Sequence, residues 1–363
     1  MAAPGLATAL AAAATNPSSR PVGTLPATAW TELVVSLGDP GADRTLSVSC
    51  RSSGGSRPAA TGGTPAGRLD RYRLGPVLGR GGQGTVYAAD QLSVERGVAV
   101  KILHPGQDPA LLLAEARLTA RIDHPNVITI HDAGADFLVM ERIRGRSLAE
   151  RLREHGPGPL AGPALAAAVE VLTVVADTVA AAHAQGVVHR DLKPANIMVG
   201  DHGAVLVVDW GLAAPLDGRG RARLDPESVC AGTPSYLPPE TAVGDGDRIG
   251  PASDVFLLGG ILYRCLAGRA PFAVDGPASA ALGASAACRI TPAPADLPGP
   301  ARLVALAARA LDPDPERRGD AAGFAAELRA WRQGAGLERE AVLAGERCRA
   351  ILADAAADWR ALA

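Results

Sequence analysis

The sequence His189-Arg-Asp-Leu-Lys-Pro-Ala-Asn196 is followed, 13 residues after Asn196, by Asp209-Trp-Gly211. This spacing suits two metal ligands, the amide of Asn196 and the carboxylate of Asp209, on either side of a hairpin. Magnesium prefers oxygen ligands and shares them with phosphate groups. Asp191 is then free to accept the proton of a substrate hydroxyl. The stretch predicts a magnesium- and phosphate-handling site.

Lysine is almost absent from the chain. Of 36 lysine and arginine residues, only Lys101 and Lys193 are lysines. A lysine in so arginine-rich a chain marks a place where the planar fork of arginine does not serve. Asparagine is also scarce, and Asn196 is one of only three. Chance survival explains such counts equally well, so they indicate where to look for chemistry without assigning a role.

A glycine-rich stretch, Leu78-Gly-Arg-Gly-Gly-Gln-Gly-Thr-Val86, precedes the first of these lysines. Glycines let backbone amides approach phosphate oxygens closely. A dinucleotide site would require a helix directly after the glycines, but Thr85 and Val86 continue as a strand.

Val98-Ala-Val-Lys101 is predicted to be a strand. A buried Lys101 needs a counter-ion, and we expect Glu115, on the next predicted helix, to provide it.

Composition excludes several classes of protein. The 363 residues carry a formal charge of −2, so no global basic field holds nucleic acid. Five cysteines without a C-x-x-C motif indicate reduced thiols rather than disulfides or a zinc site. No run of eighteen apolar residues occurs, because Glu170, Asp177 and His183 interrupt the best stretch. We therefore expect no membrane span.

The pattern of residues predicts three regions. Residues 1–67, rich in Ala, Gly, Pro and Ser, are expected to be mostly disordered, with one strand near 30–37. Residues 68–334 form the predicted folded domain, and residues 335–363 an amphipathic helix packed on it. Within the domain we expect strands over 72–78, 85–89, 97–103, 127–131 and 137–141 and helices over 109–122, 163–184, 253–267, 300–311 and 320–332. The fold class is α+β, with a strand-rich lobe before a helical one.

Taken together, these motifs resemble the eukaryotic-type protein kinase family, specifically its bacterial serine/threonine members. Three further elements support the resemblance: Gly232-Thr-Pro-Ser-Tyr-Leu-Pro-Pro-Glu240, Ser253-Asp-Val-Phe-Leu-Leu-Gly259 and Asp314-Pro-Glu-Arg317. It covers residues 70–334 and implies a bilobal fold with a small antiparallel β-rich N-lobe and a helical C-lobe. The implied cofactors are ATP and Mg²⁺.

The resemblance implies roles for individual residues. Asp191 is the implied catalytic base, Lys193 lies near the transferred phosphoryl group, and Asn196 and Asp209 ligate magnesium. Met140 resembles the residue behind the adenine. The full set implied to hold the nucleotide is Leu78, Gly79, Arg80, Gly81, Gly82, Gln83, Gly84, Thr85, Val86, Ala99, Lys101, Glu115, Met140, Glu141 and Ile143. Asp254 and a Glu240–Arg317 pair are implied to be structural.

The implied reaction is transfer of the γ-phosphoryl group of ATP to protein serine or threonine hydroxyls, in bacterial signalling. Lys193 and Thr233 match the serine/threonine pattern. We expect protein substrates and a cytoplasmic location, with the oligomeric state open, a homodimer included. The alternatives are a nucleotide-binding pseudokinase scaffold and a small-molecule phosphotransferase. Retention of Lys101, Asp191 and Asp209 disfavours the scaffold, and the segment 232–240 disfavours the phosphotransferase.

Two features depart from or extend the family pattern. Trp210 replaces the usual phenylalanine and is expected to pack near His189. Arg190 is implied to meet a phosphorylated residue of the following segment, in which Ser228 is the one hydroxyl between Gly211 and Gly232. We therefore predict autophosphorylation at Ser228 or Thr233.

Overall fold

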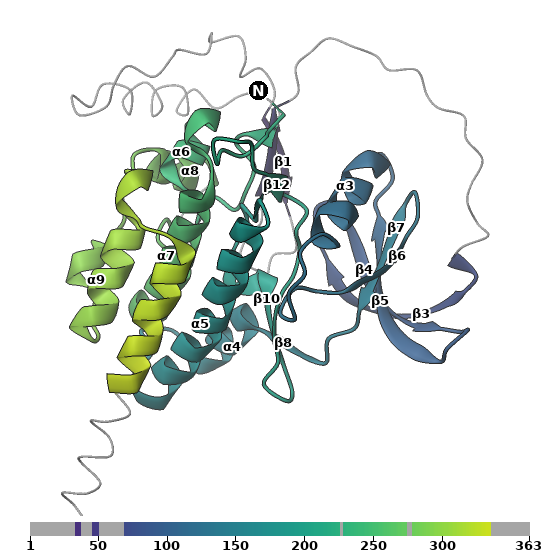
Figure 1. The fold of residues 1–363 in the computed structure, drawn as a ribbon, viewed down its shortest axis with the longest axis horizontal. Helices are drawn as coiled ribbons and strands as arrows, with labels where there is room; N and C mark the ends of the chain where they lie inside the picture. Colours follow the sequence, from purple (N-terminus) through teal and green to yellow (C-terminus); the bar gives the residue numbers. More distant parts are fainter. Residues whose placement is uncertain (1–32, 38–45, 51–68, 226–227, 274–277, 335–363) are drawn as a thin grey trace, which may run out of the picture.

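The computed structural model describes residues 33–37, 46–50, 69–225, 228–273 and 278–334. Two lobes are visible in Figure 1, a smaller one built on a β-sheet and a larger, mainly helical one. The chain passes from the first to the second after Glu141, at the end of a strand of the sheet. This arrangement is the bilobal α+β fold expected from the sequence.

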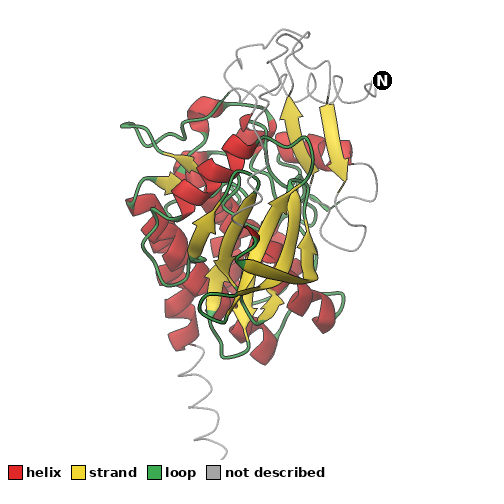
Figure 2. Cartoon of the chain, turned by 90° about the vertical axis from the view of Figure 1, so that its right-hand side faces the viewer, coloured by secondary structure: helices red, strands yellow, loops and turns green. Residues whose placement is uncertain are grey.

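The N-lobe sheet is antiparallel and has the strand order β3-β4-β5-β7-β6. Figure 2 shows it facing the viewer. The strands are β3 (Tyr72–Arg80), β4 (Gly84–Gln91), β5 (Arg96–Leu103), β6 (Ile130–Ala133) and β7 (Phe137–Glu141).

Alternation along β5 sets the position of Lys101. Side chains of successive strand residues point to opposite faces of a sheet. Val98 and Val100 are fully buried in a cluster with Phe137 and Val139 on one face. Ala99 and Lys101 therefore lie on the opposite face, which carries the helix α3 (Pro109–Thr119).

Helix α3 begins as the sequence predicts. The Asp108 carboxylate accepts a hydrogen bond from the backbone N–H of Ala110 at 2.9 Å, and a proline opens the helix. Leu112 and Ala116 pack on Leu138 of β7. Helix α3 ends at Thr119, three residues before the predicted end. The anchored apolar face fixes the rotation of the helix about its axis and so the direction of Glu115.

One predicted strand is misplaced. The expected strand over 127–131 is found as β6, starting at Ile130. Residues 126–128 instead contact the C-lobe: the backbone of Val207 donates to Asn126 at 2.7 Å, and Ile128 donates to Val207 at 3.3 Å. The backbone of this apolar segment therefore joins the two lobes before the strand begins.

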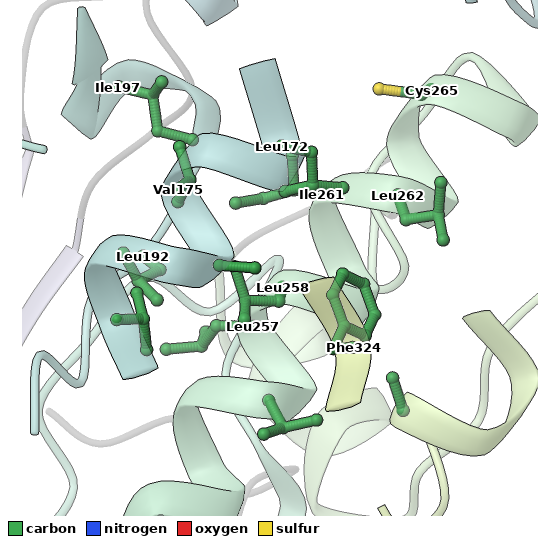
Figure 3. Packing of buried hydrophobic residues seen from close by; sticks show 14 of the residues in the cluster. Leu172, Val175, Leu192, Ile197, Leu257, Leu258, Ile261, Leu262, Cys265 and Phe324 are labelled. Carbon is green, nitrogen blue, oxygen red and sulfur yellow. The ribbon is translucent and has the colours of Figure 1, made fainter. Parts of the chain in front are cut away.

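The C-lobe is built around two long helices, α5 (Gly162–Ala184) and α7 (Pro251–Ala267). Figure 3 shows Leu172 of α5 beside Ile261 of α7, and both helices contribute to one buried core cluster. The surrounding helices are α4 (Leu148–His155), α6 (Pro239–Ala242), α8 (Ala278–Ala286), α9 (Ala301–Ala310) and the helix over 321–334.

Helix α5 is long and apolar enough to cross a membrane by length and composition. Its position argues for a different role, because Leu172, Val175 and Val179 are fully buried in the C-lobe core. Among the described residues it is the one helix that meets these criteria.

Short strands outside the N-lobe sheet carry the loops with the predicted site residues. Strands β10 (Ile197–Gly200) and β11 (Val205–Val207) form the hairpin expected between Asn196 and Asp209, and β8 (Gly145–Ser147) pairs with β10. Strand β9 (Val187–Val188) pairs with β12 (Ala214–Pro215).

The predictions for the two ends of the chain are largely untested. Within the first 67 residues, strands β1 (Leu33–Leu37) and β2 (Leu46–Cys50) pair antiparallel. The remainder of that segment and the predicted helix over 335–363 lie outside the described residues.

Candidate active site

A single buried aspartate fixes the loop that follows β9. Both carboxylate oxygens of Asp254, near the start of α7, accept backbone N–H groups, from His189 and Arg190, each at 2.8 Å. His183 on α5 contacts the same carboxylate at 2.8 Å. Burial acts to raise the pKa of Asp254, but the hydrogen bonds and charges of His183 and His189 outweigh it and lower that pKa. Asp254 therefore stays ionised and holds the loop, as the sequence implied.

The next residue in the loop, Asp191, lies in a closed network. Its Oδ2 accepts from Lys193 Nζ at 2.7 Å, and its Oδ1 accepts from the Thr233 hydroxyl at 2.7 Å. Lys193 also donates to Thr233 at 2.8 Å, and the amide nitrogen of Asn196 donates to the Asp191 carbonyl at 2.8 Å. All four residues are buried. Asp191 is thus oriented by partners from its own loop and from the segment that contains Thr233.

The predicted ion pair between Lys101 and Glu115 is present. Lys101 Nζ lies 3.0 and 2.8 Å from the two carboxylate oxygens of Glu115 and 3.7 Å from Oδ1 of Asp209. Burial acts to lower the pKa of Lys101, but the charges of Asp209 and Glu115 outweigh it and raise that pKa. Lys101 is therefore a fixed cation joining β5, α3 and the segment after β11.

Half of the Asp209 side chain is exposed. Loss of hydration acts to raise its pKa, but Lys101, Lys193 and His189 outweigh that effect and lower the pKa. Because the side chain is 49 % accessible, we take its loss of hydration to be small, so the nearby charges decide the direction of the pKa shift. The backbone of Asp209 has a φ of 60°, a conformation uncommon outside glycine. Such strain is typical of functional sites.

The side-chain oxygens of Asn196 and Asp209 fit a magnesium site. Asn196 uses its amide nitrogen on Asp191, which leaves its amide oxygen for a metal, and Asp209 supplies a carboxylate. The described residues contain no cluster of three His, Cys, Asp or Glu side chains suited to a metal. Two protein oxygens without a full cage are what Mg²⁺ uses when phosphates and water complete its shell.

The glycine-rich turn lies between β3 and β4. A Cβ on Gly84 would lie 2.4 Å from the carbonyl oxygen of Ile102, so this position admits only glycine. A Cβ on Gly79 would meet nothing within 4 Å. The turn is held down by the backbone N–H of His104, which donates to the Gln83 carbonyl at 2.9 Å. The first glycine thus borders open space, and the last permits close packing on β5.

The expected adenine-facing residues lie on neighbouring strands. Ala99 of β5 is paired with Met140 of β7, and Val98 with Glu141. The backbone N–H of Glu141 already donates to Thr129 at 2.9 Å. A base bound here would use the Glu141 carbonyl and the backbone of Ile143.

Trp210 packs where the sequence analysis places it. Its ring lies 4.5 Å from the His189 ring, centroid to centroid, and its indole N–H donates to the Val207 carbonyl at 3.3 Å. Trp210 is almost fully buried. Burial also lowers the pKa of His189. The larger ring is accommodated, and the Asp209 side chain remains half exposed.

The expected Glu240–Arg317 pair is wrong by one residue. Arg318 pairs with Glu240 through two contacts of 2.7 and 2.8 Å. Arg317 is 73 % exposed, and its guanidinium lies 3.8 Å from Asp314. Arg317 is the last residue of a short 3-10 turn, Pro315–Arg317, and Arg318 comes directly after it. The turn directs the second of them inward, which the spacing of a motif does not reveal.

The protein kinase domain model matches residues 72–323 of this chain.

The chain belongs to the protein kinase family.

Similar proteins are bacterial serine/threonine-protein kinases. PknB of Mycobacterium tuberculosis is 35 % identical over 280 residues, 74 % of this chain and 43 % of that protein. PknB of Mycolicibacterium smegmatis is 36 % identical over 231 residues, 60 % of this chain and 36 % of that protein. PknA of Mycobacterium tuberculosis is 35 % identical over 226 residues, 58 % of this chain and 50 % of that protein. This kinase chain therefore spans half or less of the length of these relatives.

The structure brings predicted site residues together in two groups, Lys101 with Glu115 and Asp209, and Asp191 with Lys193 and Asn196. It adds two residues and one helix that sequence reasoning missed or misjudged. Thr233 bonds directly to Asp191 and Lys193, whereas its sequence position suggested only substrate class or modification. His183 supports Asp254, and no motif signals this contact. Helix α4 was not predicted, although Ser147-Leu-Ala-Glu150 has the form of a capping box, and the box is formed.

Proposed function

We propose that this kinase transfers the γ-phosphoryl group of ATP to serine or threonine hydroxyls of protein substrates, using Mg²⁺. The observation that carries the proposal is the joint presence of two networks. One links Lys101, Glu115 and Asp209, and the other links Asp191, Lys193 and Thr233.

The first network suits the nucleotide. The Lys101 cation would hold the α- and β-phosphates, and Asn196 and Asp209 would hold the magnesium ion. When bound, the ion would neutralise charge on the phosphates. The glycine-rich turn would cover them, with the open space beside Gly79 leaving room for phosphate oxygens.

The second network suits the acceptor hydroxyl. Asp191, oriented through both carboxylate oxygens, would accept the hydroxyl proton. Lys193 would place a positive charge beside the transferred group. Phosphoryl transfer needs mainly positioning and electrostatic stabilisation from a protein, so this rigid arrangement supports catalysis over a scaffold role.

The segment from Gly232 to Glu240 supports a protein as the acceptor. Thr233 joins this segment to Asp191, and Glu240 joins it to Arg318. A platform fixed at both ends suits an extended peptide. Autophosphorylation at Ser228 or Thr233 stays a prediction, as do a cytoplasmic location and the choice between monomer and homodimer. Ser228 is the more accessible of the two hydroxyl groups, because Thr233 is buried.

The test is transfer of label from γ-³²P-ATP to a generic basic protein, followed by phosphoamino-acid analysis. We expect labelled serine or threonine with magnesium, loss of labelling with EDTA, and loss in Asp209→Asn. Labelled tyrosine alone would contradict the proposed substrate class. Label on a small molecule but on no protein would favour the phosphotransferase alternative.

A further inference from the structure

A short hairpin over residues 216–223 carries arginine at every second position, as Arg219, Arg221 and Arg223. An antiparallel bridge joins its two arms. This arginine hairpin comes directly after β12 and precedes the segment 232–240, which the proposed function assigns to the acceptor peptide. Its arginines have no part in the two networks of the candidate active site.

The Asp217 carboxylate fixes the tip of the arginine hairpin. One of its oxygens accepts the backbone N–H groups of Arg219 at 2.8 Å and of Arg221 at 2.9 Å. These two hydrogen bonds are the main cause of the lowered pKa of Asp217. The carboxylate therefore stays ionised at neutral pH and keeps the turn closed, so the arginines extend from a fixed backbone.

Both arms of the arginine hairpin are attached to the C-lobe. On one side, the backbone N–H of Leu216 donates to the Gly186 carbonyl at 2.7 Å, directly before the strand β9 that leads into the loop with Asp191. On the other side, the backbone N–H of Ala222 donates to the Ile249 carbonyl at 2.9 Å, shortly before α7. The hairpin therefore keeps a fixed place relative to that loop.

The three arginines differ in their partners. The guanidinium group of Arg221 pairs with Asp247 at 2.8 Å. Arg219 and Arg223 are exposed, and in the described part of the chain neither guanidinium group forms an ion pair. Two cations on a fixed backbone thus face the solvent, where each can donate charged hydrogen bonds to a carboxylate of another molecule.

The surroundings of these cations favour an acidic peptide over a polyanion. A nucleic acid or an anionic membrane needs a broad basic surface, whereas this stretch also contains Asp217 and Asp225 and the whole chain has a formal charge of −2. The predicted acceptor of the chain itself, Ser228, follows Asp225 and Glu227 in the sequence. An acceptor segment of this kind would bring two carboxylates to two arginines.

We propose that Arg219 and Arg223 bind acidic side chains that flank the acceptor serine or threonine of a protein substrate. The inference rests on the proposed function and deepens it, because it names the substrate class of the same phosphoryl transfer. The two arginines act on substrate binding and not on the reacting atoms, so their effect falls on KM and not on kcat. The preference is a ratio between substrates, and it is compatible with slower label transfer to a basic protein.

The test compares steady-state phosphorylation of three peptides that share one acceptor serine and differ only in the residues around it, which are aspartate, alanine or arginine. The proteins are the wild type, the double variant Arg219→Gln/Arg223→Gln, the charge reversal Arg223→Glu and the control Arg302→Glu. Arg302 is also exposed and forms no ion pair with another described residue, but it lies on α9. Thermal unfolding reports whether each variant keeps its fold.

We expect the KM of the wild type to be about fivefold lower for the aspartate peptide than for the alanine peptide, since each exposed ion pair contributes only a small amount. The preference should shrink as the salt concentration rises, because exposed charges are screened. The double variant should lose the preference while kcat and the KM for ATP stay unchanged. Arg223→Glu should favour the arginine peptide, and Arg302→Glu should behave as the wild type does.

Equal KM values of the wild type for the aspartate and alanine peptides would overturn the inference, and so would a preference that persists in the double variant. An equal loss with all three peptides in the double variant would also overturn it, since the shape of the hairpin and not its charge would then be the cause. A wild type that transfers label to no peptide and to no basic protein would overturn the proposed function. Transfer without an acidic preference overturns this inference alone.

Discussion

Arg318 and Glu240 form a two-contact ion pair in which neither side chain is more than 1 % exposed. The remaining polar groups are also satisfied. Glu240 accepts a second hydrogen bond from the Ser253 hydroxyl at 2.8 Å, and Arg318 donates to the Asp312 carbonyl at 2.7 Å. The pair joins the end of the segment 232–240 to the turn that precedes the last described helix. The segment 232–240 is thereby attached to the C-lobe core.

Replacing Arg318 with methionine should destabilise the kinase by about 3–5 kcal/mol, because it leaves the Glu240 carboxylate buried without its partner. The adjacent residue is a natural control. Arg317→Met should change the free energy of unfolding by no more than about 0.5 kcal/mol, since Arg317 is exposed. Urea unfolding of both variants measures the difference, and equal effects at the two positions would refute the assignment.

Lys101→Met should reduce kcat about 10²- to 10³-fold, as expected when one preorganised charge in an active site is removed. Glu115→Gln should reduce it less, because Lys101 keeps its contact with Asp209. Arg96→Met, at the exposed start of the same strand, serves as the control. Steady-state phosphorylation assays report the three values. Full activity in Lys101→Met would show that this ion pair has no part in the reaction.

Thr233→Val should lower kcat about tenfold and should also lower the melting temperature, because two buried charged groups each lose a hydrogen bond. Valine keeps the shape of threonine but loses the hydroxyl that bonds to both Asp191 and Lys193, and such charged hydrogen bonds are worth about 1.5–3 kcal/mol. Thr233→Ser should retain activity. A Thr233→Val variant with the wild-type rate, or a Thr233→Ser variant as slow as Thr233→Val, would show that the hydroxyl group alone does not account for the effect.

Burial lowers the pKa of His189 below its ordinary value of about 6.5. The unfolded chain then binds a proton more readily than the folded chain as the pH falls below about 6.5. The shifted pKa of His189 therefore stabilises the fold fully above that pH. This stabilisation is lost as the pH falls towards the pKa of His189 in the folded protein. The melting temperature of wild type should fall more between about pH 7.5 and 5.5 than that of His189→Gln.

His202→Gln is the control for this pH dependence, because His202 is exposed on the turn after β10. Its melting temperature should follow that of wild type across the same range. A His189→Gln variant with the full wild-type pH dependence would show that another group causes the acid sensitivity.

The sequence predicted most of the lobe architecture because strong local patterns determine it. The Val-Ala-Val-Lys101 alternation determines which face of β5 carries the lysine, and Asp108 with Pro109 marks the start of α3. The loop over 189–196 is predicted for a similar reason, since its polar and charged side chains lie within eight positions of each other. Local spacing is sufficient to place such groups near one another.

Contacts between residues that are distant in the sequence are harder to predict. Thr233 reaches Asp191 across 42 residues, and Arg318 reaches Glu240 across 78. The path of the whole C-lobe determines which of two adjacent arginines turns inward. The motif alone therefore predicts Arg317 where the structure has Arg318. The start of β6 is predicted too early for the same reason. The residues before β6 resemble the beginning of a strand, but their backbone pairs with Val207, which is distant in the sequence.

The central claim is tested most directly by comparing wild type with Asp191→Asn for transfer of label from γ-³²P-ATP with magnesium, with and without a basic protein substrate. Asn keeps the size of the side chain but cannot accept the hydroxyl proton as a carboxylate does. The proposed mechanism predicts label transfer by the wild type and a loss of at least about 10²-fold in the variant, with nucleotide affinity retained. Equal transfer by the two proteins, or none by a wild type that binds nucleotide, would contradict it.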